Sequence, residues 1–270
     1  MPSTREITVS QLNRLIGTPD CPAIVDICLQ EDFDAAPVLV PGAFRHSHSD
    51  IPGLIRRLDG KPAVILCQKG RKLSQGVVAW LASEGLQAEY LQGGMQAWRA
   101  AEGTQSLPFA ALPDPVEGAT LWVTRHRPKV DRIACPWLIR RFVDPAARFL
   151  FVSPAEVAAV ADRFRATPFD VEGVVFSHRA DTCTFDTMLQ TFGLTSPALH
   201  RLALVVRGAD TNRHDLHPAA AGLLAMSVGL SRQYRCDHAQ LDAGMILYDS
   251  LYRWARDGHE EGHDWPAART

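Results

Sequence analysis

The chain has 270 residues, of which 46% are hydrophobic and 21% are charged, and its formal net charge is −2. At about 100–200 residues per domain, this length predicts two domains or one large one, and the apolar content excludes a disordered or disulfide-stapled chain. The charge argues against a global basic field for nucleic acid, although it is compatible with a local basic patch.

The first part of the chain, residues 1–103, alternates short apolar runs with amphipathic stretches. The runs 23–27, 63–67 and 88–91 have the composition of buried strands. Between the last two, residues 73–84 carry apolar side chains on a helical period, and Gly85 ends the pattern. The order strand, helix, strand predicts an α/β domain with a parallel sheet flanked by helices.

A segment rich in proline and glycine, 104–118, predicts a linker to a second domain at 119–258, and 259–270 reads as a polar tail. The second domain is expected to be a mostly helical α+β domain. Its predicted strands are 121–124, 149–152 and 174–176, and its predicted helices are 130–142, 154–164, 184–192, 197–207, 217–231 and 237–256.

The cysteines indicate the compartment. The six of them form no CxxC pair and fit no zinc ribbon or disulfide framework. The first twenty residues lack the apolar core of a secretory signal, and no run of about 18 apolar residues follows. The sequence therefore predicts a cytoplasmic protein in a reducing environment, without a membrane partner.

Cys67 has the strongest signal of a reactive residue. It ends an apolar run and is followed by a basic turn and then a helix. Such a turn presents backbone N–H groups and the positive end of a helix dipole, and these together with the basic side chains should favour the thiolate. The expected anion cradle consists of Gln68, Lys69, Gly70, Arg71 and Lys72. The alternative is a buried cysteine beside a solvated basic turn.

The segment Cys67–Lys72 resembles the active-site loop of rhodanese-like domains. Three further motifs stand in the order of that family: the strand 24–27 containing Asp26, the turn 40–43, and the closing segment Leu91–Trp98. The resemblance implies sulfurtransfer, in which Cys67 accepts a sulfane sulfur as a persulfide. It also implies a small-molecule sulfur donor and a thiol or cyanide-like acceptor.

One position departs from that family. Where many members carry arginine two residues after the strand aspartate, this chain has Cys28. The change removes an expected ion pair near the site. Cys28 is either a resolving thiol or a small core residue, and the second interpretation is favoured.

The densest cation cluster lies in the second part of the chain. Arg125, Arg127, Lys129 and Arg132 stand at a predicted strand-to-helix junction. Arginine forks suit a tetrahedral oxyanion such as chromate or sulfate, and a solvated basic face is the alternative. Asp131 is read here as a helix N-cap or an ion-pair partner.

A candidate metal site follows further along the chain. His178 and Cys183 are separated by a polar turn, and Asp210, at the end of a predicted helix, is a candidate third ligand. A divalent metal ion is therefore a candidate cofactor of the second domain. The segment 259–263 also matches H-E-x-x-H, but its glycine and the neighbouring proline argue against the helix that zinc protease chemistry needs.

The second part as a whole resembles the C-terminal domain of ChrB-type chromate-resistance proteins. The resemblance covers about 119–257 and is carried by strings such as 130–141, 183–186, 206–210 and 241–249. We therefore expect a sulfurtransferase-type protein, with persulfide on Cys67, coupled to an oxyanion- or metal-binding domain. The alternative is a chromate- or sulfate-responsive sensor or binding protein with an inactive rhodanese domain.

Overall fold

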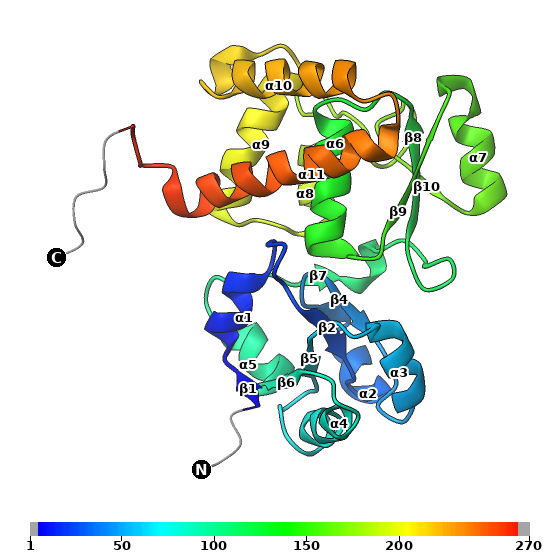
Figure 1. Ribbon diagram of the computed structural model, residues 1–270, viewed down its shortest axis with the longest axis vertical. Coiled ribbons are helices and arrows are strands. Elements are labelled where there is room, and N and C mark those ends of the chain that lie inside the picture. The colour runs from blue at the N-terminus through cyan, green and yellow to red at the C-terminus, as the bar shows by residue number, and fades with distance from the viewer. Residues whose placement is uncertain (1–4, 264–270) are drawn as a thin grey trace. The chain divides into compact units, whose positions relative to one another are not determined.

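The computed structural model describes residues 5–263. The chain divides into two compact units (Figure 1). The first unit takes in 5–121 together with Leu138–Arg148 and Thr191–Leu194, and the remaining described residues form the second unit. The part of the tail at 264–270 lies outside the described residues.

The first unit is built on a five-stranded sheet in which neighbouring strands are parallel, in the order β1-β6-β5-β2-β4. This confirms the predicted α/β class with a parallel sheet. The strands are β1 (Glu6–Ile7), β2 (Ala23–Asp26), β4 (Ala43–Arg45), β5 (Ala63–Leu66) and β6 (Ala88–Leu91). The helices are α1 (Val9–Leu15), α2 (Gln30–Asp34), α3 (Ile51–Leu58), α4 (Lys72–Ser83) and α5 (Gly94–Ala100).

Both faces of this sheet are covered, which explains why its central strand reads as an unbroken apolar run. Every residue of β5 is buried. On one face, α3 and α4 pack Leu54 and Leu81 against Val25 and Ile65. Helices α1 and α5 lie on the opposite side of the sheet from α3 (Figure 1).

Part of the segment predicted as a linker packs on the first unit. Strand β7 (Leu107–Pro108) pairs antiparallel with β3 (Val38–Leu39). Leu107 is completely buried, and a short 3-10 turn, Phe109–Ala111, follows. The domain boundaries at 103 and 119 stay predictions.

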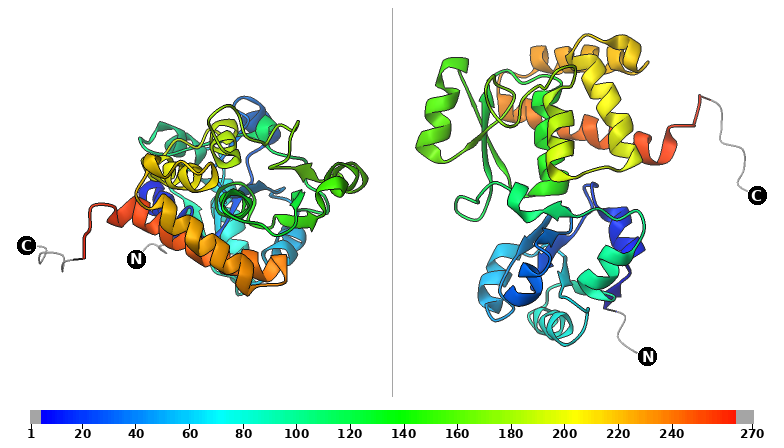
Figure 2. Two further views of the ribbon diagram at one scale, coloured as in Figure 1. Left: turned by 90° about the horizontal axis from the view of Figure 1, so that it is seen from above. Right: turned by 180° about the vertical axis from the view of Figure 1, so that it is seen from behind.

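The second unit combines a small sheet with a larger set of helices, as expected for a mostly helical α+β domain (Figures 1 and 2). Its three strands are ordered β10-β8-β9, with β8 (Leu121–Arg125), β9 (Arg148–Val152) and β10 (Thr167–Pro168). Its helices are α6 (Asp131–Leu138), α7 (Val157–Phe164), α8 (Thr184–Phe192), α9 (Pro197–Asp210), α10 (Ala220–Gln233) and α11 (Asp237–Arg253). Helices α9, α10 and α11 pack on one another.

Three predicted elements of the second part need correction. The predicted strand 174–176 is reduced to a single bridge between Phe169 and Phe176. The predicted helix 130–142 ends as an α-helix at Leu138 and continues as a π-helical turn, Ile139–Val143; Pro136, which has no N–H to donate, stands just before this change. The helix predicted from 154 begins with a 3-10 turn, Pro154–Glu156. Among the helices of the described residues, none has the length and apolar character needed to cross a bilayer.

Candidate functional sites

Cys67 lies where β5 ends, on the turn that leads into α4. Its side chain is 5% exposed, and its Sγ is 3.2 Å from the hydroxyl oxygen of Ser74 in the first turn of α4. The backbone N–H groups of Lys69, Arg71 and Ser74 also donate hydrogen bonds to it. The sulfur therefore sits among converging donors, the environment that stabilises a thiolate.

The turn keeps this shape because it is docked on the start of α5. The carbonyl oxygens of Cys67 and Gln68 accept hydrogen bonds from the N–H groups of Met95 (3.0 Å) and Gln96 (3.1 Å). Gly70 has a φ of +61°, and a Cβ there would lie only 2.7 Å from the backbone nitrogen of Gly94. Only glycine permits this close approach of two backbone segments.

These donors act against burial in setting the acidity of the Cys67 thiol. Burial raises the pKa of Cys67, but the hydrogen bonds from the Ser74 side chain and from the backbone of Ser74, Arg71 and Lys69 outweigh it, so that the pKa lies below its ordinary value. The side chains of Lys69, Arg71 and Lys72 are exposed. The hydrogen bond from the Ser74 hydroxyl is the leading cause of the lowered pKa, and the backbone N–H groups come next.

The sequence prediction of the cradle missed Ser74. Its hydroxyl oxygen reaches both the sulfur of Cys67 and the carbonyl oxygen of Arg71 (3.2 Å each). A serine in the first turn of the helix that follows a reactive cysteine is the signal that could have identified it.

Replacing Ser74 by alanine should raise the pKa of Cys67 and slow its reaction with iodoacetamide about five- to tenfold at neutral pH, because one hydrogen bond to the thiolate is lost. Peptide mapping across a pH series measures the rate at Cys67 separately from the other cysteines. In Ser83→Ala, which removes an exposed serine near the end of α4, the pH profile of Cys67 should stay unchanged. Coincident profiles for wild type and Ser74→Ala would contradict the assigned role of the hydroxyl.

Arg45, on the neighbouring strand β4, supplies a cation near Asp26 in place of the arginine that was expected at position 28. Cys28 is buried, and its N–H donates to Asp26 (2.7 Å). The guanidinium of Arg45, on β4, donates to the carbonyl oxygen of Cys28 (3.2 Å) and lies close enough to oppose the burial that raises the pKa of Asp26. Burial and the charge of Asp26 raise the pKa of Cys28, which keeps this thiol protonated, in line with a packing role.

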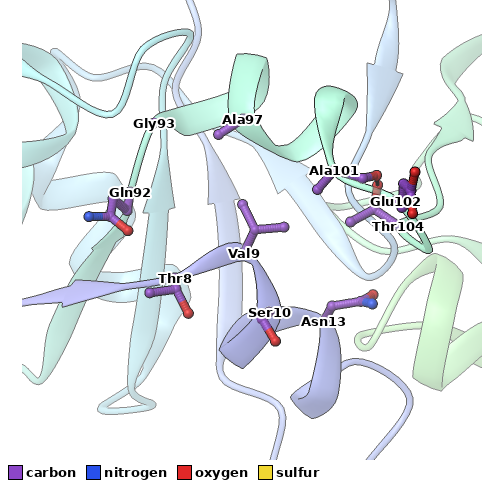
Figure 3. A pocket seen from close by; sticks show the side chains of 10 residues that line it. All are labelled: Thr8, Val9, Ser10, Asn13, Gln92, Gly93, Ala97, Ala101, Glu102 and Thr104. Atoms are coloured by element: carbon purple, nitrogen blue, oxygen red, sulfur yellow. Dashed lines mark hydrogen bonds between the residues drawn. The ribbon is translucent and has the colours of Figure 1, made fainter.

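A hollow of about 480 Å³ also lies on the first unit, but Cys67 is not part of its lining. Figure 3 shows α1 on one side of it, with Thr8, Ser10 and Asn13, and α5 with the residues that follow on the other. Its lining is a mixture of small and polar side chains, with Glu102 at one end. No lysine, arginine, histidine or cysteine is among the lining residues, so the hollow offers no group for the chemistry expected of Cys67.

The three arginines among the predicted oxyanion residues of the second unit are engaged with protein groups. Arg125 and Arg132 both form ion pairs with Asp170, at 2.8 and 3.0 Å. Arg127 donates through its side chain to the carbonyl oxygen of Ser231 (3.0 Å) and through its backbone to Asp237 (3.0 Å). Lys129 supplies a carbonyl oxygen to the backbone N–H of Arg132 (3.0 Å). Binding of an oxyanion by these residues stays a prediction, and in this structure Asp170 occupies two of the forks.

Four other side chains converge on one point in the second unit. The Nε2 atom of His178 lies 3.3 Å from Asp131, 3.4 Å from Asp170 and 3.1 Å from Asp210, each distance being to a carboxylate oxygen. Asp131 opens α6 and Asp210 closes α9, whereas Asp170 and His178 lie in the irregular segment between β10 and α8. We call these four residues the His–Asp cluster.

The electrostatics of the His–Asp cluster are those of carboxylates crowded together in a buried place. Burial and the charge of Asp131 raise the pKa of Asp210 to about 8. The hydrogen bond to Asp131 and the three carboxylate charges raise the pKa of His178 to about 9, against the effect of burial. Burial and Asp131 also raise the pKa of Asp170, while Arg125 and Arg132 lower it.

The predicted ligand set of His178, Cys183 and Asp210 is brought together only in part. His178 and Asp210 meet, but the thiol of Cys183 donates instead to Asp186 (3.3 Å). The groups that could hold a metal ion together are Asp131, Asp170 and His178, because each offers one ligand atom within 4.8 Å of the other two. The sequence interpretation gave Asp131 a capping or pairing role and did not single out Asp170. The H-E-x-x-H segment 259–263 forms a turn and irregular chain, without the helix that zinc protease chemistry requires.

Comparison with known proteins shows what the second part is similar to. Residues 122–255 match the family described as "ChrB, C-terminal domain". The curated Protein ChrB of Cupriavidus metallidurans is 37% identical over 132 residues, which are 48% of this chain and 39% of that protein. The predicted resemblance of the second part to ChrB is thereby confirmed, and the present chain spans well under half the length of this relative.

Solved structures are similar to the first part. A rhodanese-like domain protein from Staphylococcus aureus is 29% identical, with 38% of this chain and 97% of that chain covered and a TM-score of 0.32. SSP1007 from Staphylococcus saprophyticus is 28% identical, with 38% and 99% covered and a TM-score of 0.32.

Proposed function

We propose that this protein is a sulfurtransferase-type protein that carries persulfide sulfur on Cys67, and that it acts in chromate resistance. The observation that carries the proposal is the donor set around Cys67: the Ser74 hydroxyl and three backbone N–H groups converge on a sulfur whose pKa is lowered despite burial. A donor set of this kind stabilises the thiolate before reaction and a terminal persulfide anion after it.

The reaction can be written with thiosulfate as the sulfur donor. The Cys67 thiolate attacks the outer sulfur of thiosulfate, a new S–S bond forms, and sulfite leaves with the electron pair of the broken S–S bond. An acceptor such as cyanide then attacks the terminal sulfur, thiocyanate leaves, and the thiolate is restored. Each half-reaction therefore needs the sulfur of Cys67 as thiolate, nucleophile first and leaving group afterwards.

The second unit and the cysteines support the process and the compartment that we propose for this chemistry. The match of residues 122–255 to the ChrB C-terminal domain supports a role in chromate resistance. Chromate or sulfate is the ligand that we propose for this role. All six cysteines are free thiols, which supports action in a reducing compartment such as the cytoplasm.

Mass spectrometry of the full chain after incubation with thiosulfate tests the proposal. The peptide that contains Cys67 should gain about 32 Da, one sulfur atom, and cyanide should remove the added mass. The peptide that contains Cys28 provides the internal control and should stay unmodified. If no adduct forms at Cys67, the proposal fails, and a chromate- or sulfate-responsive binding protein with an inactive first domain becomes the better reading.

A further inference from the structure

The His–Asp cluster crowds three carboxylates around one imidazole. The other donors to these carboxylates are Thr184, whose backbone N–H and hydroxyl donate to Asp131 (3.3 Å) and Asp170 (3.1 Å), and the two arginines on Asp170. One imidazole nitrogen has oxygens of three different carboxylates within 3.4 Å, although a single N–H group points at one acceptor. Asp131 and Asp170 are 1% and 4% exposed, so water cannot make up the difference freely. Three carboxylates and an imidazole aimed at one place form the arrangement that surrounds a metal ion.

The balance of charges supports the same conclusion. Asp170 has two arginine partners, Arg125 and Arg132. Among the residues that the structure describes, Asp131 and Asp210 have no ion pair with a lysine or arginine, and His178 is their shared cationic partner. Buried carboxylates in proteins are paired with a cationic side chain or bound to a metal ion.

A second observation does not depend on the carboxylates. The thiol of Cys135 is completely buried and, within the described part of the chain, it makes no hydrogen bond. It lies one turn after Asp131 on α6, and the charges of Asp131, Asp170 and Asp210 all act on it. An unpartnered, fully buried soft donor therefore lies on the same helix as Asp131, one turn further along.

We propose that Asp131, Asp170, His178 and Asp210 bind one divalent transition-metal ion. The imidazole favours ions such as Mn²⁺, Fe²⁺, Co²⁺ or Zn²⁺ over Ca²⁺, which prefers oxygen ligands alone. The His178 side chain is 42% exposed, so an ion can enter from solvent on that side. Binding replaces the proton on the imidazole, and on any protonated carboxylate, by the metal ion, and the released protons go to solvent. The site is distinct from Cys67 and does not depend on sulfurtransfer.

The test uses the untagged full chain, stripped with a chelator, desalted, and titrated separately with Co²⁺ and Mn²⁺. Co²⁺ is followed by its ligand-field absorbance and Mn²⁺ by electron paramagnetic resonance. Wild type should bind one equivalent, and His178→Ala should weaken the affinity at least about tenfold. His200→Ala is the matched control, because His200 is an exposed histidine on α9, the helix that Asp210 closes.

Asp131→Asn provides a second variant on another element of the site. It should also lower the affinity at least about tenfold, and circular dichroism establishes whether each variant is folded. If Asp131→Asn fails to fold, His178→Gln replaces it, because that side chain is partly exposed. Failure of wild type to bind one equivalent, or equal affinity in wild type and the folded variants, would overturn the proposal and leave His178 as an ion-pair partner only.

Discussion

Replacing Cys67 by serine should lower the rate of thiosulfate:cyanide sulfurtransfer by at least about 1000-fold. The hydroxyl oxygen of serine cannot accept a sulfane sulfur, and its pKa keeps it protonated at neutral pH, so both half-reactions lose their reacting atom. The substitution replaces one sulfur atom by oxygen at a buried position that is 5% exposed, and it changes the side-chain volume little. The measurement is the rate of thiocyanate formation by the full chain.

Cys28→Ser serves as the matched control for this variant. Both cysteines are buried in the first unit, but the pKa of Cys28 is raised by burial and by Asp26, whereas that of Cys67 is lowered by its hydrogen bonds. Cys28→Ser should therefore keep activity within about threefold of wild type. Thiocyanate formation that survives in Cys67→Ser would remove the proposed role of this thiol, and loss in Cys28→Ser alone would move that role to the other cysteine.

The Cys67 site was predictable because its parts are close together in the sequence. The apolar strand, the turn with Gly70 and the helix start are consecutive, and such a turn presents its N–H groups whatever the rest of the fold does. The segment that holds the turn in place is more distant. Gly94 and Met95 were recognised only through the resemblance to a family, because no local pattern says which backbone the turn will touch.

The His–Asp cluster was predictable only in part because its residues come from three separate segments. His178 and Asp210 could be chosen by residue type and position, but Asp170 follows a short strand, and nothing in its neighbourhood marks it as a ligand. Cys183 illustrates the opposite error. It has a suitable spacing from His178, yet a local hydrogen bond turns its thiol towards Asp186. Spacing fixes which residues can meet, and side-chain direction decides which ones do.

The four basic residues at 125–132 show that a sequence reveals a cluster of cations but not the carboxylates that pair with them in the fold. The cluster suggested an unoccupied anion site, but Asp170 is 45 residues away from Arg125 along the chain and pairs with its guanidinium. An anion that binds these arginines must therefore compete with a buried carboxylate. This competition lowers the affinity expected for chromate or sulfate at Arg125 and Arg132 relative to an open basic face.

Replacing Gly94 by alanine should destabilise the first unit by about 3 kcal/mol or more and disrupt the Cys67 turn. Gly94 has a φ of +60°, so any side chain there is strained. A Cβ would also overlap the carbonyl oxygen of Cys67 and the backbone nitrogen of Gly70, and it would lie 2.9 Å from the carbonyl carbon of Gln68. These contacts are backbone atoms, which cannot move aside without displacing the N–H groups that surround the sulfur. Calorimetry and the thiocyanate assay measure the two effects.

Gly85→Ala separates backbone strain from this close approach. Gly85 has a φ of +81°, but beyond its own chain neighbours no described atom lies within 4 Å of the position that its Cβ would take. It should therefore cost only about 1–2 kcal/mol, the strain of the left-handed conformation, and leave sulfurtransfer intact. The difference between the two variants measures how strongly the start of α5 holds the turn. If Gly94→Ala were no more destabilising than Gly85→Ala and equally active, the cradle around Cys67 would not depend on the contact between these two backbone segments.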